Sequence, residues 1–122
     1  MEFAVNAVKV ATPGSSDSPP GGEYIAIAVG MKNISKSPIQ ISGTSAMYSG
    51  GNFALGDVFG KNYDPARCSC GVGPPPNGVV SPGGLLAGTL VYDVPKGSQL
   101  VLVFTPDVSD PSASAYVDLG TI

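Results

Sequence analysis

Apolar residues alternate with polar or small residues along most of this chain, and stretches rich in Gly and Pro separate the alternating runs. A period of two places successive side chains on opposite faces of a β-strand, whereas Gly and Pro form the turns between strands. About seven or eight short strands, with turns roughly every 8–12 residues, are typical of a sandwich. The pattern predicts an all-β protein, an immunoglobulin-like antiparallel β-sandwich, with residues 1–122 forming a single domain.

The clearest predicted strand spans residues 23–32, where both the odd-numbered and the even-numbered side chains are apolar or small. Such a strand has no face that suits water, so we expect it to be central in its sheet. The other predicted strands are 3–11, with a bulge at Asn6-Ala7 where the alternation slips, then 39–48, 53–57, 61–64, 86–94, 99–105 and 114–119. The expected core consists of Ile25, Ile27, Val29, Leu90, Tyr92, Leu102 and Phe104.

Three turn-like stretches separate these strands. Asp57 at the first position and Gly60 at the fourth indicate a type I turn, which predicts a hairpin. Residues 65–84 are rich in Gly and Pro and are expected to be a loop, because the run Pro74–Pro76 cannot lie inside a sheet. The tripeptide Asn33-Ile34-Ser35 has the form of a glycosylation acceptor, although its position favours a simple turn.

Several motifs resemble a bacterial extracytoplasmic family of unknown function with an immunoglobulin-like fold. The similar stretches are Tyr24–Ser35, Phe53–Tyr63, Gly88–Gly97 and the strand Leu100–Phe104. Members of that family are often lipoproteins, and a small secreted immunogenic antigen of mycobacteria belongs to the same structural group. The resemblance implies an antiparallel sandwich outside the cytoplasm and supplies no catalytic residues. The Cys68-Ser69-Cys70 insert and the triple proline depart from the family pattern.

The charge of the chain argues against two classes of partner. Six cations are scattered singly in a chain of net charge −3, so no basic stripe is present to bind nucleic acid or an anionic membrane surface. The longest apolar run is shorter than the roughly 20 residues that span a bilayer. We therefore expect no membrane span within these residues. The resemblance implies a secreted or cell-surface protein whose lipid anchor, where one exists, lies outside these residues.

Catalysis is not expected from this composition. The chain contains no histidine, which excludes Ser-His-Asp and Cys-His catalysis and imidazole metal sites. Its acidic residues lie mainly in or beside turns, where Asp accepts hydrogen bonds from the backbone and faces water. The sequence therefore predicts a protein that is not an enzyme and that carries no cofactor.

Cys68 and Cys70 are the residues with the most distinctive chemistry. They could form a disulfide, remain free thiols or bind a soft metal, but two thiolates alone leave zinc two ligands short. An oxidising compartment favours the disulfide. We expect a disulfide at the surface, in a tight turn, that contributes little to stability, because so small a ring removes little entropy from the unfolded chain.

Aromatic residues provide the second candidate site. Phe59, Tyr63 and Tyr48 are a candidate partner surface, with Phe59 at the predicted hairpin tip. The alternative, which the sequence favours for Phe59, is a ring folded back over the sheet edge. The expected function is therefore an extracytoplasmic, non-catalytic interaction or structural module with an unknown protein or cell-envelope partner. The competing hypothesis is a carrier of a small ligand or metal that uses the Cys68/Cys70 loop.

Overall fold

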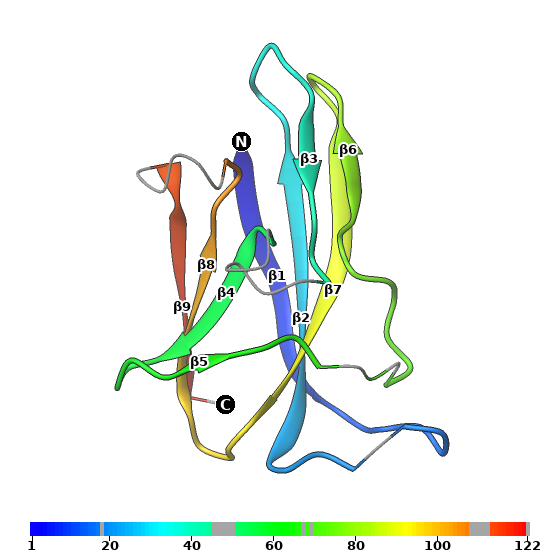
Figure 1. The fold of residues 1–122 in the computed structure, drawn as a ribbon, viewed down its shortest axis with the longest axis vertical. Coiled ribbons are helices and arrows are strands. Elements are labelled where there is room, and N and C mark those ends of the chain that lie inside the picture. The colour runs from blue at the N-terminus through cyan, green and yellow to red at the C-terminus, as the bar shows by residue number, and fades with distance from the viewer. Residues whose placement is uncertain (18, 45–50, 67, 69, 108–112, 122) are drawn as a thin grey trace.

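Two antiparallel sheets pack face to face in the computed structural model, which describes residues 1–17, 19–44, 51–66, 68, 70–107 and 113–121. The first sheet has the order β1-β2-β7 and the second has the order β5-β4-β8-β9, while β3 and β6 form a two-stranded sheet where β2 ends and β7 begins (Figure 1). The strands are β1 (Glu2–Ala11), β2 (Glu23–Lys32), β3 (Ile39–Ile41), β4 (Phe53–Asp57), β5 (Asn62–Tyr63), β6 (Gly78–Val80), β7 (Leu85–Val94), β8 (Gln99–Phe104) and β9 (Ala115–Thr121). The predicted immunoglobulin-like sandwich is confirmed.

Most of the predicted strands are present. Strand β2 has the predicted bounds and pairs with β1 on one edge and β7 on the other, as expected of a central strand. The β1–β2 register shifts between Val5 and Ala7, which confirms the predicted bulge. No helix in the described part of the chain is long and apolar enough to cross a membrane.

Two strand predictions need correction. The predicted loop 65–84 contains strand β6, which pairs with β3. This strand is short and lies directly after three prolines, so its alternation extends over too few residues to be recognised. Strand β3 ends at Ile41, earlier than the predicted 39–48, and residues 45–48 of that prediction lie outside the described part of the chain.

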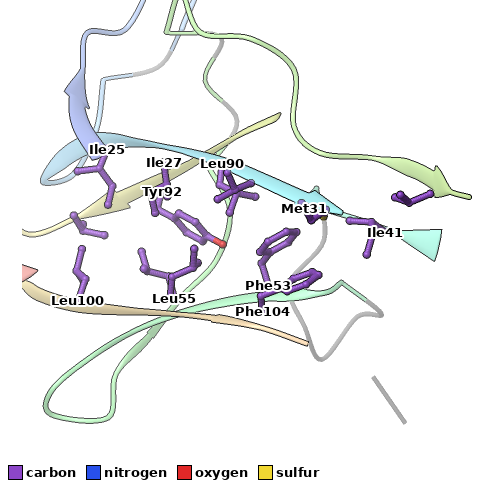
Figure 2. Close-up of a cluster of buried hydrophobic side chains, with 14 residues drawn as sticks. Ile25, Ile27, Met31, Ile41, Phe53, Leu55, Leu90, Tyr92, Leu100 and Phe104 are labelled. Carbon is purple, nitrogen blue, oxygen red and sulfur yellow. The ribbon is translucent and has the colours of Figure 1, made fainter. Parts of the chain in front are cut away.

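The core lies between the two sheets and consists of their inward-facing side chains (Figure 2). All seven residues predicted for the core are buried. Three rings close one end of it: Phe104 stacks on Phe3 with centroids 4.6 Å apart, and Phe53 lies 5.0 Å from Phe104. Such aromatic pairs contribute about 0.5–1.5 kcal/mol beyond the area they bury.

Asn33 is fully buried where β2 ends, and it holds this end of the sandwich together. Its Nδ2 donates to the carbonyls of Ser37 and Val80, each at 2.8 Å, and its Oδ1 accepts from the amide and the hydroxyl of Ser35. Its backbone also bonds to Gly83 and Gly84, just before β7. The Asn-Ile-Ser tripeptide is therefore a structural corner, and its amide nitrogen is not exposed for glycosylation.

Tyr92 carries an unusual polar atom in the core. The residue is 1% exposed, and its hydroxyl has no hydrogen-bond partner among the described residues. Burial and, to a lesser degree, the nearby Asp64 carboxylate raise the pKa of Tyr92, so the hydroxyl stays neutral. A buried hydroxyl without a partner lowers stability because it has lost its bonds to water.

We expect Asn33→Ala to lower the free energy of unfolding by about 2–4 kcal/mol, because it leaves the buried Val80 carbonyl and the Ser35 amide without a partner. Urea denaturation measures this loss. Ser37→Ala is a matched control, since Ser37 contacts Asn33 through its backbone carbonyl alone. A loss under about 0.5 kcal/mol, the range of ordinary surface substitutions, would contradict the assigned role.

We expect Tyr92→Phe to leave the free energy of unfolding unchanged or to raise it by about 1 kcal/mol, because the hydroxyl it removes has no partner in the described structure. Tyr63→Phe is the comparison, since the Tyr63 hydroxyl donates to Asp57 and its removal should be mildly destabilising. A clear loss of stability in Tyr92→Phe would show that the hydroxyl makes a bond in solution.

Candidate functional site

Described residues of the segment from 65 to 84 lie along the edge of β7 that faces away from β2, at Pro65–Ala66 and at Pro74. The Ala66 amide donates to the Val91 carbonyl at 2.8 Å, and the Thr89 amide donates to the Pro74 carbonyl at 2.9 Å. Pro65 also forms an isolated bridge with Tyr92. The segment thus satisfies part of an edge that would otherwise be open to pairing with another chain. Although it is irregular, it is docked on the sheet.

The triple proline packs against a glycine of β7. A Cβ added at Gly88 would lie 2.3 Å from the Pro76 nitrogen, so only glycine allows the backbones to approach so closely. Pro76 is buried, and on its other side a Cβ at Gly43 would lie 2.7 Å from its Cδ. The Gly43 amide also donates to Asn77 Oδ1. These contacts explain the Gly88 and triple-proline motifs as packing features.

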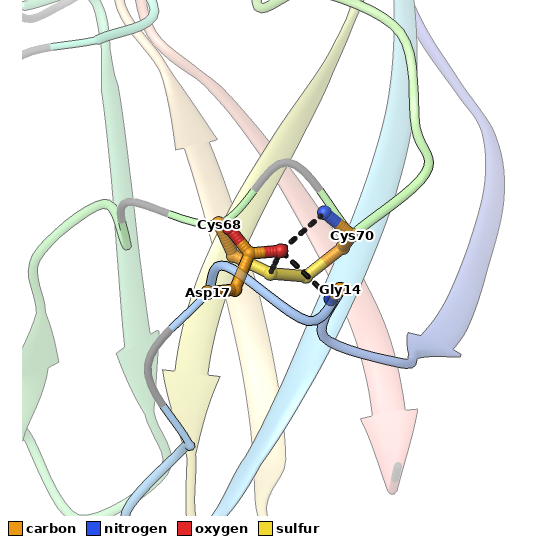
Figure 3. The surroundings of a disulfide bond; sticks show 4 residues. All are labelled: Gly14, Asp17, Cys68 and Cys70. Carbon is orange, nitrogen blue, oxygen red and sulfur yellow. Dashed lines mark hydrogen bonds between the residues drawn. A yellow bond between two sulfur atoms is a disulfide. The ribbon is translucent and has the colours of Figure 1, made fainter.

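Cys68 and Cys70 form a disulfide beside the loop that joins β1 and β2 (Figure 3), with their Cα atoms 5.2 Å apart. One part of the prediction was wrong: Cys70 is only 9% exposed and is not on the surface. It belongs to a second apolar cluster, on the outer face of the first sheet, together with Ala11, Tyr24, Ala26 and Val91. Because β2 is apolar on both faces, its outer face needs this cover.

Asp17 joins the two loops at the disulfide. Its Oδ2 accepts from the amides of Gly14 at 2.8 Å and Cys70 at 3.3 Å, and it lies 3.5 Å from the Cys68 sulfur (Figure 3). The ligand atoms of Asp17, Cys68 and Cys70 all lie within 4.8 Å of one another. In the disulfide the sulfurs are not thiolates, so only the reduced protein could offer all three atoms to a metal.

The hairpin between β4 and β5 is closed by Asp57, as the type I turn signature predicts. Asp57 Oδ1 accepts from the amides of Phe59 and Lys61, each at 2.9 Å, and Oδ2 accepts from the Tyr63 hydroxyl at 3.2 Å. Gly60 has a φ of +87°, the left-handed conformation of the residue that follows a type I turn in a three-residue hairpin loop. The Lys61 amide, then that of Phe59, and the Tyr63 hydroxyl hold the pKa of Asp57 below its ordinary value despite partial desolvation.

Phe59 is 92% exposed at the tip of this hairpin. The interpretation that its ring folds back over the sheet edge was therefore wrong: the network of Asp57 fixes the turn with the ring directed outward. Tyr63 is half-buried, and Lys61 Nζ lies 5.3 Å from the centroid of its ring. Partial burial, then the bond to Asp57, raises the pKa of Tyr63. Tyr48, the third residue of the candidate partner surface, lies outside the described residues.

A groove runs beside the hairpin tip, and we call it the tip groove. It consists of two adjoining depressions of about 510 and 630 Å³, which share Lys61, Tyr63, Pro95 and Lys96. One depression reaches Phe59 and Gln99, and the other reaches Gly21 and Asp93. The sequence predicted the Asp57–Gly60 turn beside the groove, but it gave no signal that the fold would bring Lys61 and Lys96 to one site.

The aspartates near these sites bind the backbone. Asp93 Oδ2 accepts from Gly21 at 2.7 Å and Oδ1 from Gly22 at 2.9 Å, which fixes the β1–β2 loop against β7. Asp118 likewise accepts from the amide of Gly120. Asp57 and Asp93 both line the tip groove, but their oxygens accept hydrogen bonds from backbone amides and, for Asp57, from the Tyr63 hydroxyl. These hydrogen bonds are those of turn stabilisation.

The fold and its sites define an immunoglobulin-like β-sandwich domain with no catalytic constellation among its described residues. Residues 1–113 match the family described as a domain of unknown function (DUF4352), and the chain belongs to that family. The resemblance recognised from the sequence motifs is thus confirmed. None of the curated proteins matches the chain.

Solved structures show the same sandwich. The chain is similar to ycdA, a candidate lipoprotein from Bacillus subtilis subsp. subtilis str. 168, with 17% identity and a TM-score of 0.73 over 95% of this chain and 35% of ycdA. The yjhA protein of B. subtilis has 23% identity and a TM-score of 0.71, covering 95% of this chain and 89% of yjhA. The secreted protein MPT63 of Mycobacterium tuberculosis has 15% identity and a TM-score of 0.60, covering 84% of this chain and 72% of MPT63. These similarities establish the fold.

We expect reduction of the disulfide alone to lower the melting temperature by no more than about 2–4 °C, because the small ring it opens adds little entropy to the unfolded chain. Cys68→Ser/Cys70→Ser should lower it further, since a serine hydroxyl would replace the Cys70 sulfur in an apolar cluster. Calorimetry with and without a thiol reductant separates the two effects. If reduction alone lowers the melting temperature as much as the double substitution does, the cross-link itself holds the 65–84 segment in place.

Proposed function

We propose that this chain is a non-catalytic interaction module that acts outside the cytoplasm, secreted or at the cell surface, and that it contacts its protein or cell-envelope partner through the β4–β5 hairpin tip. The observation that carries the proposal is the 92% exposure of Phe59 on a turn that Asp57 fixes in place. Exposure of a large apolar side chain to water is unfavourable. Its transfer to a partner's surface lowers the free energy.

The proposed location has separate support. The similar structures include a candidate lipoprotein and a secreted protein. The Cys68–Cys70 disulfide is chemistry that persists in oxidising compartments. Both observations favour an extracytoplasmic module. The net charge of −3 separately offers little attraction to nucleic acid or anionic lipid.

One second candidate is favoured by a specific observation. The Asp17, Cys68 and Cys70 ligand atoms form a compact cluster, which supports a carrier of a thiophilic metal when the two cysteines are reduced. Titration of Cd²⁺ into reduced and oxidised protein, followed by sulfur-to-metal charge-transfer absorption, tests it. Stoichiometric binding by the reduced protein, lost in Cys68→Ser, would support the carrier. Failure to bind in the reduced state would reject it.

A photoreactive phenylalanine analogue at position 59 tests the leading proposal. We expect it to give a discrete cross-linked product with a partner in intact cells of the source organism, and purified native domain should suppress that product. Phe59→Ala should fail to suppress it while its free energy of unfolding changes by no more than about 0.5 kcal/mol, as for other surface substitutions.

The matched control carries the photoreactive residue at position 116, because Tyr116 is also strongly exposed, at 71%, but lies on β9 away from the hairpin tip. Equal cross-linking from positions 59 and 116, or none from position 59, would contradict the assignment of the contact surface.

A further inference from the structure

Resting on the proposed function, we propose further that the tip groove binds an extended acidic peptide segment of the partner, in which carboxylates lie beside an apolar side chain. The groove combines two features that such a segment would match. One is the pair of lysines, Lys61 and Lys96, and the other is the exposed ring of Phe59.

The two lysines are the cations of the tip groove, which Asp57 and Asp93 also line. Both are exposed, and neither forms an ion pair with a carboxylate in the part of the chain that the structure describes. The two carboxylates that line the groove, Asp57 and Asp93, direct their oxygens to backbone amides and the Tyr63 hydroxyl. These hydrogen bonds direct the carboxylate oxygens to the chain's own donors without removing their negative charge. The attraction for an incoming carboxylate is therefore local to the two ammonium groups, of which that of Lys61 also lies over the Tyr63 ring.

The shape of the groove favours a chain over a single ion. Its two depressions meet at Lys61 and Lys96 and continue from Gln99 and Thr121 on one side to Gly21 and Gly22 on the other. An extended peptide advances about 3.3 Å per residue, so several of its side chains would contact the groove in succession. Two cations are too few for the many phosphate contacts that give nucleic acid its affinity.

The apolar requirement follows from Phe59 and its neighbours. Val58 is 55% exposed beside it, and Pro95 is exposed on the facing turn. A ligand carrying carboxylates alone would leave this surface in water. A peptide that places an aliphatic or aromatic residue next to its acidic residues would bury the Phe59 ring while the lysines attract the carboxylates. The apolar contact would then supply most of the affinity, and the charges would steer the peptide to the groove.

Selection from a displayed library of random peptides, with the disulfide-intact domain as the target, tests the inference. We expect the selected peptides to be enriched in Asp and Glu beside an apolar residue. A synthetic peptide with the enriched sequence should bind the Lys61→Glu/Lys96→Glu variant at least about tenfold more weakly, a change of about 1.4 kcal/mol. Binding should also weaken as salt is raised, because exposed charges are screened beyond about 8 Å at physiological ionic strength.

The matched control is Lys9→Glu/Lys36→Glu, which makes the same change of net charge at two exposed lysines outside the groove and should alter affinity by less than about twofold. Phe59→Ala should weaken binding as well, and anionic-lipid vesicles should not bind.

The remaining outcomes separate this inference from the proposed function. Neutral peptides that require Phe59 but bind Lys61→Glu/Lys96→Glu unchanged would overturn the acidic ligand and leave the hairpin tip as the contact surface. Binders that tolerate Phe59→Ala, or no binders at all, would overturn both. Vesicle binding without peptide binding would show that the lysines serve a membrane surface and would also overturn the inference.

Discussion

Burial of β2 on both faces is the constraint on which the rest of this structure depends. Its inner face, with Ile25, Ile27 and Val29, forms the core between the sheets, while Tyr24 and Ala26 on the outer face would meet water in a bare sandwich. The 65–84 segment removes that exposure. It bonds to the free edge of β7, places Cys70 on the outer cluster and reaches the β1–β2 loop through Asp17. The cysteine insert and the triple proline, which depart from the family pattern, are therefore explained by packing. No ligand of the cysteines is needed to explain them.

Local patterns in the sequence were sufficient to predict the strands, the bulge in β1 and the Asp57–Gly60 turn, because period-two alternation and turn chemistry act between near neighbours in the chain. Features that depend on distant pairings could not be read in this way. Strand β6 pairs with β3, and the buried Asn33 amide donates a hydrogen bond to the Val80 carbonyl, 47 residues away. The groove that Lys61 and Lys96 share could not be predicted either, because the two residues are distant in the sequence. Phe59 shows a different limit of sequence-based prediction. The turn pattern predicted its position at the hairpin tip, but it did not predict the direction of its ring.

Rigid corners at one end and an exposed tip at the other divide the molecule into parts with different roles. Asn33 ties loops to strands and exposes no reactive group. The same holds for Asn52, which is also buried and whose Nδ2 donates to the Thr105 carbonyl. Asp57 and Asp93 likewise accept hydrogen bonds from backbone amides near the hairpin. There, however, the ordered backbone leaves Phe59 and two lysines exposed to solvent. A preorganised apolar tip loses little conformational entropy on binding, which suits the proposed contact with a partner.

The central claim is that the hairpin tip, and not the disulfide segment, is the contact surface. Amide chemical-shift mapping by NMR with a library-selected peptide tests it most directly, because both regions are observed in one spectrum. We expect shifts concentrated at residues 57–63 and 96–99, with the Cys70 amide unchanged. Shifts concentrated at the Cys70 amide and the neighbouring Asp17 loop, with Phe59 and Lys61 unmoved, would contradict it.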